Sequence, residues 1–317
     1  MIAGNLPDLL DYIDAKTIKV HAPTLVVFVC GGLCGKVSEK PLSLRDAFMR
    51  ISHKSPLAKY RLILAEDVKA FFPLGEYQEL LKFESDIAQI SELLLLFSES
   101  AGSLAELGVF AMDDEVAPRM MVIVDDDNYK SPSFIKLGPL YTLMLHYGDA
   151  AVCVIVLADV NLTNINKVED IDLEKLRNIL EEPLKARLAI KREPRTFNRQ
   201  RHGHVTKLIT GLIQHYAALT IEEIDVLLYC LDVPTSYGDI RKHILCAETF
   251  GWVLSEKRGV KTYYAAVAPK TALHFEFATG VANLDRRRWR ADIIEYWKVA
   301  EPERFGVISV AAVRSTK

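Results

Sequence analysis

The stretch that decides the fold reads Leu93-Leu94-Leu95-Leu96-Phe97-Ser98-Glu99-Ser100-Ala101-Gly102-Ser103-Leu104-Ala105-Glu106-Leu107-Gly108. Its apolar run is typical of a strand buried in a parallel sheet and ends at Phe97. Small residues follow, and a helical pattern opens at Ser103. A strand, a tight turn and a helix N-terminus bind anions and polar ligands in open α/β sheets. The stretch therefore predicts an α/β fold with a ligand site at this turn.

Glu106 is the predicted catalytic residue. It falls in the first turn of the expected helix, facing the crevice, where a carboxylate can attack or stabilise an oxocarbenium-like sugar centre. The spacing Ser103-x-x-Glu106 also fits a capping box, in which both side chains bind backbone N–H groups of the first turn. The same spacing recurs at Thr220-x-x-Glu223, which we interpret only as a cap. Spacing alone favours the capping role for Glu106, although the two roles are not exclusive.

Five short runs, apolar on both faces, are typical of strands in a parallel sheet. They cover residues 24–30, 61–64, 93–97, 120–124 and 151–157. Helical patterns lie between them, around residues 44–51, 77–91, 104–112 and 133–145. The alternation predicts a doubly wound, five-stranded parallel sheet of the flavodoxin-like kind, within a catalytic domain at residues 1–165.

Small and acidic residues follow every predicted strand, at the edge where such sheets bind ligands. Ordinary loops favour the same residues, so the coincidence across five strand ends carries the argument. We expect the glycines to let the backbone approach ribose and phosphate, and Glu84, Asp125 and Asn128 to contact ribose or handle a proton. The predicted substrate-binding residues are Gly31, Gly32, Glu84, Ser98, Ser100, Gly102, Ser103, Asp125 and Asn128.

Length and composition set the limits of these predictions. A chain of 317 residues, 50% hydrophobic, suggests two or three domains with a sizeable core. A net charge of −3 gives no general attraction to nucleic acid or acidic membranes. No Walker loop, GxSxG elbow or HExxH motif is present in the sequence.

The cysteines and the N-terminal residues favour a cytoplasmic protein. Five cysteines, an odd number and mostly within apolar runs, suit reduced thiols. Cys30-x-x-x-Cys34 lacks a second ligand pair, so we predict no metal site. Asp8, Asp11 and Asp14 stand where a signal peptide would be basic, and no apolar run approaches the ~20 residues of a membrane span.

The second half predicts a separate domain. Residues 166–202 contain a basic stretch that fits a helical linker, either a solvated face or a phosphate-contacting one. Residues 203–275 fit a winged helix-turn-helix, with helices opened by Thr220 and Ser236 and a β-hairpin around Lys257-Arg258-Gly259. The predicted nucleic-acid contacts are Arg241, Lys242, Lys257, Arg258 and Lys261. A protein-interaction module is the alternative for this domain.

A tail at residues 276–317 carries the basic run Arg286-Arg287-Arg288-Trp289-Arg290. The arginines could clamp a nucleic-acid backbone, with Trp289 available for base stacking. They could equally dock on an acidic face of another subunit.

The first half resembles the nucleoside 2-deoxyribosyltransferase-like superfamily, and the whole chain resembles effectors encoded beside bacterial retron reverse transcriptases. Most of residues 25–140 carry the resemblance, and Glu99-Ser100-x-Gly102-Ser103-x-x-Glu106-Leu107-Gly108 is its specific part. The other matching segments are residues 28–32, 66–67, 80–84 and 133–139. The second half matches in architecture more than in motif.

The resemblance implies that a glutamate at the position of Glu106 attacks the anomeric carbon of a nucleoside or nucleotide. For the effectors it implies hydrolysis of a nucleotide such as NAD, which is then a substrate rather than a cofactor. It also implies control by a reverse transcriptase and its multicopy single-stranded DNA (msDNA), in a homo-oligomer or larger assembly. One departure stands out: deoxyribosyltransferases carry a base-recognising aspartate where this chain has Ser100.

Three functions therefore stay open. The first is an antiviral N-glycosidase that cleaves NAD to nicotinamide and ADP-ribose. The second is a nucleoside deoxyribosyltransferase or hydrolase of salvage, against which the winged helix argues. The third is a nucleotide-sensing DNA-binding regulator without catalysis.

Overall fold

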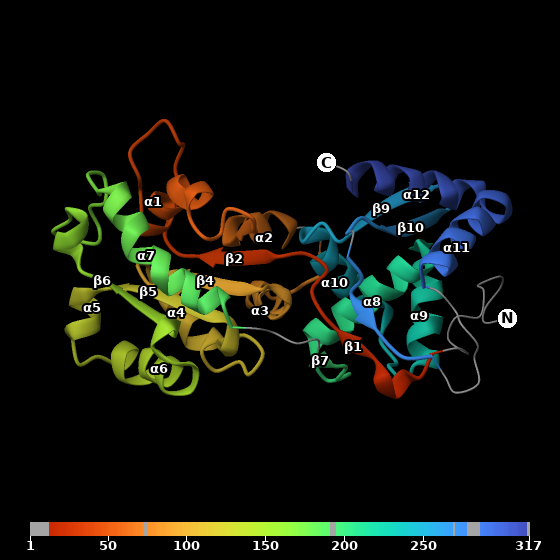
Figure 1. The fold of residues 1–317 in the computed structure, drawn as a ribbon, viewed down its shortest axis with the longest axis horizontal. Helices are drawn as coiled ribbons and strands as arrows, with labels where there is room; N and C mark the ends of the chain where they lie inside the picture. The colour runs from red at the N-terminus through yellow and green to blue at the C-terminus, as the bar shows by residue number, and fades with distance from the viewer. Residues whose placement is uncertain (1–12, 73–74, 191–194, 269, 278–285, 316–317) are drawn as a thin grey trace. The chain divides into compact units, whose positions relative to one another are not determined.

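The computed structural model describes residues 13–72, 75–190, 195–268, 270–277 and 286–315 (Figure 1). It divides into two compact units. The α/β unit comprises Leu25–Ala70 and Ile87–Arg192, and the C-terminal unit comprises Met1–Thr24, Phe71–Asp86 and Glu193–Lys317. Asp8 and Asp11, together with Lys191 and Arg192 of the basic stretch, lie outside the described residues.

The α/β unit is built on a parallel sheet of five strands in the order β3-β2-β4-β5-β6. The strands are β2 (Val26–Cys30), β3 (Arg61–Leu64), β4 (Leu93–Phe97), β5 (Met120–Asp125) and β6 (Val152–Ile155). Every residue of β2, β4 and β5 is buried, as expected for strands covered on both faces. The predicted five-stranded parallel sheet is confirmed, and its strand order is flavodoxin-like.

Six α-helices of the described residues accompany the sheet: α1 (Leu44–Ile51), α2 (Ala65–Phe71), α4 (Ala101–Phe110), α5 (Asp126–Lys130), α6 (Tyr141–Tyr147) and α7 (Leu173–Leu188). Helix α3 (Leu80–Ile90) contributes only its last turn, from Ile87 on, to this unit. Helices α1 and α7 share one apolar cluster with alternate strand residues such as Val29 and Leu95. Side chains alternate along a strand, so Cys30 points to the opposite face of the sheet.

Helix α7 corrects the prediction of a linker over residues 166–202. Its residues Leu176, Leu180 and Leu184 are buried in the core of the α/β unit. They recur every four residues and form an apolar stripe, although most of the residues around them are charged. Arg187 is buried too and donates to the backbone oxygens of Met120 (2.8 Å) and Pro118 (2.7 Å), so it is not available to phosphate.

The C-terminal unit is organised around α8 (His202–Tyr216), which is buried along almost its whole length. Helices α9 (Ile221–Cys230) and α10 (Tyr237–Thr249) precede a hairpin of β9 (Val253–Arg258) and β10 (Lys261–Ala266). Strand β8 (Ala218–Leu219) pairs with β10, and α11 (Arg286–Ala300) and α12 (Pro302–Ser315) follow. A second small sheet has the order β11-β1-β7, formed by Leu273–His274, Lys19–Val20 and Arg195–Thr196.

Local signals in this unit are confirmed in detail. Thr220 and Glu223 form the predicted capping box of α9, and Ser236 caps α10. The hairpin turns at Gly259, whose φ of +56° is one that glycine adopts without strain. No helix within the described ranges is long and apolar enough to cross a membrane.

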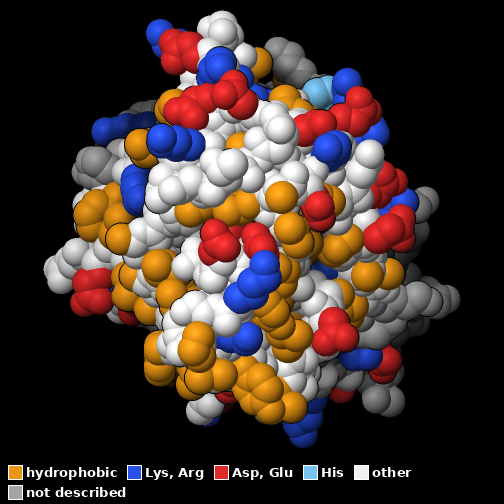
Figure 2. Space-filling view, turned by 90° about the vertical axis from the view of Figure 1, so that its left-hand side faces the viewer, with side chains coloured by type: hydrophobic (Ala, Val, Ile, Leu, Met, Phe, Trp, Pro, Cys, Tyr) orange, Lys and Arg blue, Asp and Glu red, His pale blue; other side chains and the backbone are white. Residues whose placement is uncertain are grey.

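An apolar surface lies over α6 and the π-helix (Lys136–Leu140) before it. Phe134 is 84% exposed, and Leu137, Tyr141 and Leu145 are also exposed. Figure 2 faces the α/β unit and shows hydrophobic side chains gathered toward the lower part of this view, the level at which Figure 1 places α6. A contiguous apolar surface of this kind commonly marks a contact with another molecule.

Candidate active site at the carboxyl edge of the sheet

The candidate site lies where the strand order reverses. The first strand of the sheet, β2, sits between the second, β3, and the third, β4. Cys30 at the end of β2 is in register with Leu96 near the end of β4, so the two loops that follow leave the sheet at the same edge. Doubly wound sheets bind ligands at this reversal point.

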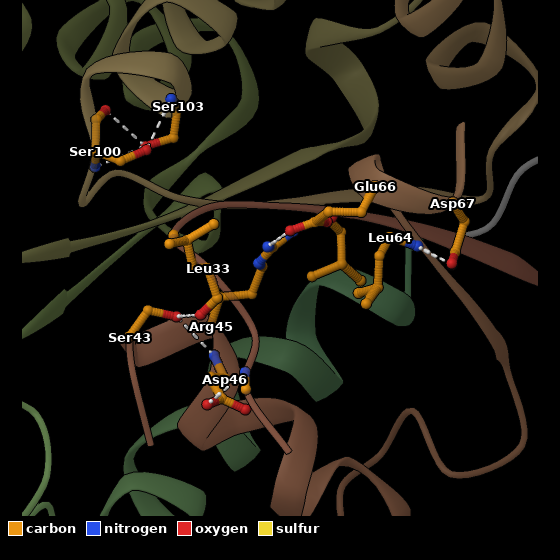
Figure 3. A network of polar contacts seen from close by, with 12 residues as sticks. Leu33, Ser43, Arg45, Asp46, Leu64, Glu66, Asp67, Ser100 and Ser103 are labelled. Atoms are coloured by element: carbon orange, nitrogen blue, oxygen red, sulfur yellow. Dashed lines mark hydrogen bonds and ion pairs between the residues drawn. The ribbon is translucent and has the colours of Figure 1, made fainter. Parts of the chain in front are cut away.

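Helix α4 begins earlier than predicted, and this changes the role of Glu106. Ser100, not Ser103, is the N-cap, and its side chain accepts from the Ser103 backbone N–H at 3.2 Å. Ser103 closes the box by accepting from the Ser100 backbone N–H at 3.0 Å (Figure 3). The predicted capping box between Ser103 and Glu106 is therefore wrong, because Ser100 already occupies the capping position. Glu106 lies in the second turn of the helix with its carboxylate free of the cap.

The Glu106 side chain is half-buried, and its Oε2 atom has no hydrogen-bond partner among the described residues. Burial raises the pKa of this carboxyl group above its ordinary value, while Lys69 and a hydrogen bond from the Cys30 thiol act in the opposite direction. Arg45 and Glu66 also act on it electrostatically. The carboxylate thus stands at the end of β2, in a setting of mixed charge.

Two further polar atoms at this edge are buried without a partner among the described residues. They are Oγ of Ser98, directly after β4, and Nε of Arg45 in α1. Buried polar atoms in folded proteins are almost always hydrogen-bonded, so each exception needs an explanation. A donor and two acceptors left open at one edge of a sheet are what a bound polar ligand would satisfy.

The predicted glycines pack the edge tightly. A Cβ on Gly31 would come within 2.9 Å of the Phe97 side chain, and one on Gly32 within 2.7 Å of Ser43. Glycine is needed at both positions for the approach of α1 and β4, whether or not a ligand also lies there. Gly102 is exposed in the first turn of α4, and a Cβ there would meet only the Ser100 hydroxyl, at 3.9 Å, so packing does not require glycine at this position.

Glu99 belongs to the quoted motif but was not among the predicted site residues. Its carboxylate accepts from the backbone N–H groups of Gly32 (2.9 Å), Leu44 (2.6 Å) and Arg45 (3.1 Å). Burial raises the pKa of Glu99 even against these three hydrogen bonds. The loop after β4 is therefore tied to the N-terminus of α1, where a carboxylate is favoured by the helix dipole.

The remaining predicted substrate contacts are less concentrated. Asp125 caps α5 and accepts from both the backbone N–H (3.0 Å) and the side-chain amide (2.6 Å) of Asn128, so these two residues satisfy each other. Glu84 is buried on α3 in the segment Phe71–Asp86, which belongs to the C-terminal unit. The α/β unit by itself gathers Ser98, Ser100, Ser103 and Glu106 with the two glycines.

Most of the cations predicted to contact nucleic acid already have an acidic partner. Arg241 pairs with Glu76 (3.2 Å), Lys242 with Asp239 (2.9 Å), Arg258 with Glu256 (2.5 Å) and Lys261 with Glu301 (3.8 Å). Lys257 is exposed on the hairpin and has no such partner among the described residues. Because surface ion pairs are worth only about 0–1 kcal/mol, they do not prevent these cations from contacting phosphate.

The Trp289 side chain in the tail contacts the C-terminal end of α8. Its indole N–H donates to the backbone oxygen of His215 at 3.0 Å, and its ring packs edge-on against Tyr216. The side chains of Arg286 and Arg287 lie outside the described residues. Within the described ranges, no group of three or more His, Cys, Asp or Glu side chains is placed to hold a metal ion.

Comparison with known proteins identifies the family. A family model described as "STM3845 retron effector protein" matches residues 41–256, more than half of the chain. Two Escherichia coli proteins are each 28% identical, over 129 and 130 residues. They are named "Retron Ec86 putative ribosyltransferase/DNA-binding protein" and "Retron Ec73 putative ribosyltransferase/DNA-binding protein". Each match covers 38% of this chain and only 37% and 40% of the respective relative. On the family match, this chain belongs to the STM3845 retron effector family.

Proposed function

We propose that this protein is an N-glycosidase that cleaves a nucleotide, and that its substrate is NAD. The observation that carries the proposal is the Glu106 carboxylate, half-buried, free of the helix cap and with an open acceptor atom at the reversal point of the sheet. The relatives' names, which include ribosyltransferase, support chemistry at a ribose. No cofactor is part of the proposal, since NAD is the substrate.

The chemistry follows from the leaving group. A Glu106 oxygen bonds to the anomeric carbon of the ribose while the bond from that carbon to nicotinamide breaks. The electron pair of the broken bond neutralises the positive charge of the nicotinamide ring, so no general acid has to protonate it. Water then displaces Glu106 and gives ADP-ribose and a proton. Glu106 acts either as this nucleophile or as an electrostatic stabiliser of the oxocarbenium-like centre.

The position of Ser100 supports hydrolysis over base exchange. Deoxyribosyltransferases have an aspartate there to recognise the base, whereas Ser100 is engaged as the N-cap of α4. A serine in this position cannot make the charged contact. The salvage alternative therefore has less support than cleavage of a cationic leaving group.

The first experiment measures nicotinamide release from NAD by the wild type and by Glu106→Gln, alone and with the products of neighbouring genes. Glu174→Gln, which alters an exposed carboxylate of α7, is the matched control. We expect Glu106→Gln to lose turnover by about 10³-fold or more while the control keeps it, because the reaction depends on the charged nucleophile. A thermal unfolding curve shows that both variants are folded.

Release that does not depend on Glu106 would contradict the assigned role. If no assembly releases nicotinamide, the NAD proposal fails, and other nucleosides and nucleotides should be screened. If the protein is instead a nucleotide-sensing regulator without catalysis, Glu106→Gln should still bind DNA in response to the nucleotide as the wild type does.

DNA contact by the C-terminal unit is the second part of the proposal. Two capped helices, α9 and α10, followed by the hairpin β9–β10 support a winged helix-turn-helix, and both relatives carry DNA-binding in their names. Lys257→Ala with Arg258→Ala should weaken binding to duplex DNA and reduce its salt dependence, measured by fluorescence anisotropy. Unchanged binding would favour the protein-interaction alternative.

We also propose that the retron reverse transcriptase and its msDNA hold this effector inactive until phage infection, in the cytoplasm. The family assignment supports this link to a retron. The exposed apolar surface over α6 supports assembly with a further copy or with these partners. Size-exclusion chromatography with light scattering of the effector, alone and with its partners, tests the assembly.

A further inference from the structure

A buried arginine presents a second carboxylate at the same edge of the sheet. Arg45 of α1 is only 1% exposed, and its guanidinium makes two hydrogen bonds to the carboxylate of Glu66, one of them at 2.8 Å. Glu66 stands in the first turn of α2 and is 43% exposed, so a ligand can reach it. Figure 3 shows the Arg45 side chain extending from α1 to Glu66. An arginine fork holds a carboxylate in one orientation better than a single contact can.

The same contacts bring this pair close to Glu106. Arg45 also donates to the backbone oxygen of Val29 at 3.4 Å, next to Cys30, whose thiol reaches Glu106. Val29 is in register with Leu64, two residues before Glu66. Glu66 in the helix after β3 and Glu106 in the helix after β4 therefore both approach the end of β2, and Glu66 acts electrostatically on Glu106.

The pKa values of the two carboxyl groups are shifted in opposite directions. Burial alone would raise the pKa of Glu66, but the hydrogen bonds and charge of Arg45, together with a backbone hydrogen bond and Lys69, outweigh it and hold that pKa below its ordinary value. The pKa of Glu106, by contrast, is raised. Environments that separate two carboxyl groups in this way commonly separate their roles. A carboxylate held ionised in this way can only accept hydrogen bonds.

We infer that Glu66 is a specificity-determining residue that accepts hydrogen bonds from the ribose hydroxyls of the substrate, and that Arg45 positions it. The inference rests on the proposed function, in which Glu106 acts on the anomeric carbon of that ribose. An ionised acceptor on the sugar hydroxyls favours the cationic, oxocarbenium-like transition state, because hydrogen bonds to the 2-hydroxyl strengthen there. It also selects a ribose over a 2′-deoxyribose.

The test compares NAD with its analogue that carries 2′-deoxyribose on the nicotinamide side. Glu66→Gln keeps an oxygen for Arg45 but removes the charge, and Asp67→Asn, its neighbour that bonds the Leu64 backbone N–H, is the matched control. We expect Glu66→Gln to lower kcat/KM for NAD by roughly 10- to 100-fold, the range of one charge-assisted hydrogen bond, and to leave the deoxy analogue almost unchanged. The control should keep the preference of the wild type.

Equal losses on both substrates, or no loss on either, would overturn the inference. Binding of ADP-ribose, measured by calorimetry, is a readout that needs no turnover. Glu66→Gln should bind it about 10-fold more weakly than the wild type, and Asp67→Asn should bind it equally well. If the wild type binds ADP-ribose but cleaves neither substrate, the proposed function fails and the binding data still decide on Glu66. If the wild type does not bind ADP-ribose, the inference fails too.

Discussion

Two segments of this chain have the same sequence spacing and opposite outcomes. Thr220 and Glu223 form a capping box, with the Thr220 backbone N–H donating to Glu223 at 2.8 Å. Ser103 and Glu106 do not, because the helix in which they lie is capped by Ser100. A four-residue pattern thus fixes a helix terminus only where no competing cap stands just before it. The glutamate left over in the second case is the candidate nucleophile.

The surroundings of the two glutamates differ as much as their caps. Glu223 also pairs with Arg304 at 2.5 Å, and Arg304 is fully buried against Trp297, with its guanidinium 3.7 Å from the ring centre. Glu106 has an open oxygen and no cation within ion-pairing distance among the described residues. Glu223 therefore stabilises the C-terminal unit, whereas Glu106 has a carboxylate oxygen that a ligand can contact.

The largest effect is expected on stability, when Glu223 is removed from its contacts in the C-terminal unit. Glu223→Ala removes the cap acceptor of α9 and one partner of the buried Arg304, leaving Glu301 at 3.2 Å. We expect the free energy of unfolding to fall by about 3–5 kcal/mol, since a buried cation loses its ion pair. Urea unfolding of the whole chain measures it, with the exposed neighbour Glu222→Ala as control. A loss below that of the control would mean that Arg304 is satisfied without Glu223.

A smaller effect should show which serine starts α4. Ser100→Ala removes the N-cap and should cost about 1 kcal/mol, similar to Thr220→Ala at α9. Hydrogen exchange of the first-turn amides of α4 locates the loss. If Ser100→Ala is neutral, Ser103 rather than Ser100 caps the helix, and Glu106 returns to the capping box.

The smallest effect concerns the pH dependence of stability at Glu106. Its folded pKa is raised above the ordinary value of 4.5, so the folded state binds a proton more readily than the unfolded state. The free energy of unfolding of the wild type should therefore fall as pH rises between those two pKa values, and stay level above them. Glu106→Gln lacks this decrease and should be more stable at neutral pH, by about 1 kcal/mol or less because the group is only half-buried. The difference in the free energy of unfolding between the wild type and Glu106→Gln should disappear as pH falls to 4. A difference that stays constant with pH would contradict the raised pKa. Glu174→Gln serves as the control.

The sequence determined the elements of this protein and their class. Runs such as Leu93–Phe97 are apolar on both faces, and a chain segment of that kind has to be covered on both sides, so a parallel sheet with flanking helices follows. The helices opened by Ser43, Thr220 and Ser236 obey local capping rules that need only neighbouring residues. The hairpin turn at Gly259 is local in the same sense.

Only the tertiary structure showed which residues meet at the candidate site and which segments of the chain belong to each unit. Glu99 binds backbone N–H groups up to 67 residues away, Arg45 holds Glu66 from another helix, and the stripe of α7 finds its partner in the sheet. The stripe of α7 is periodic in the sequence, but the partners in these contacts are not, because loops bring together residues whose separation along the chain is arbitrary. The segment Phe71–Asp86 joins the C-terminal unit for the same reason. Local spacing indicates which side chains could either cap a helix or take part in a reaction. Contacts between residues far apart in the sequence determine which of these two roles each side chain has.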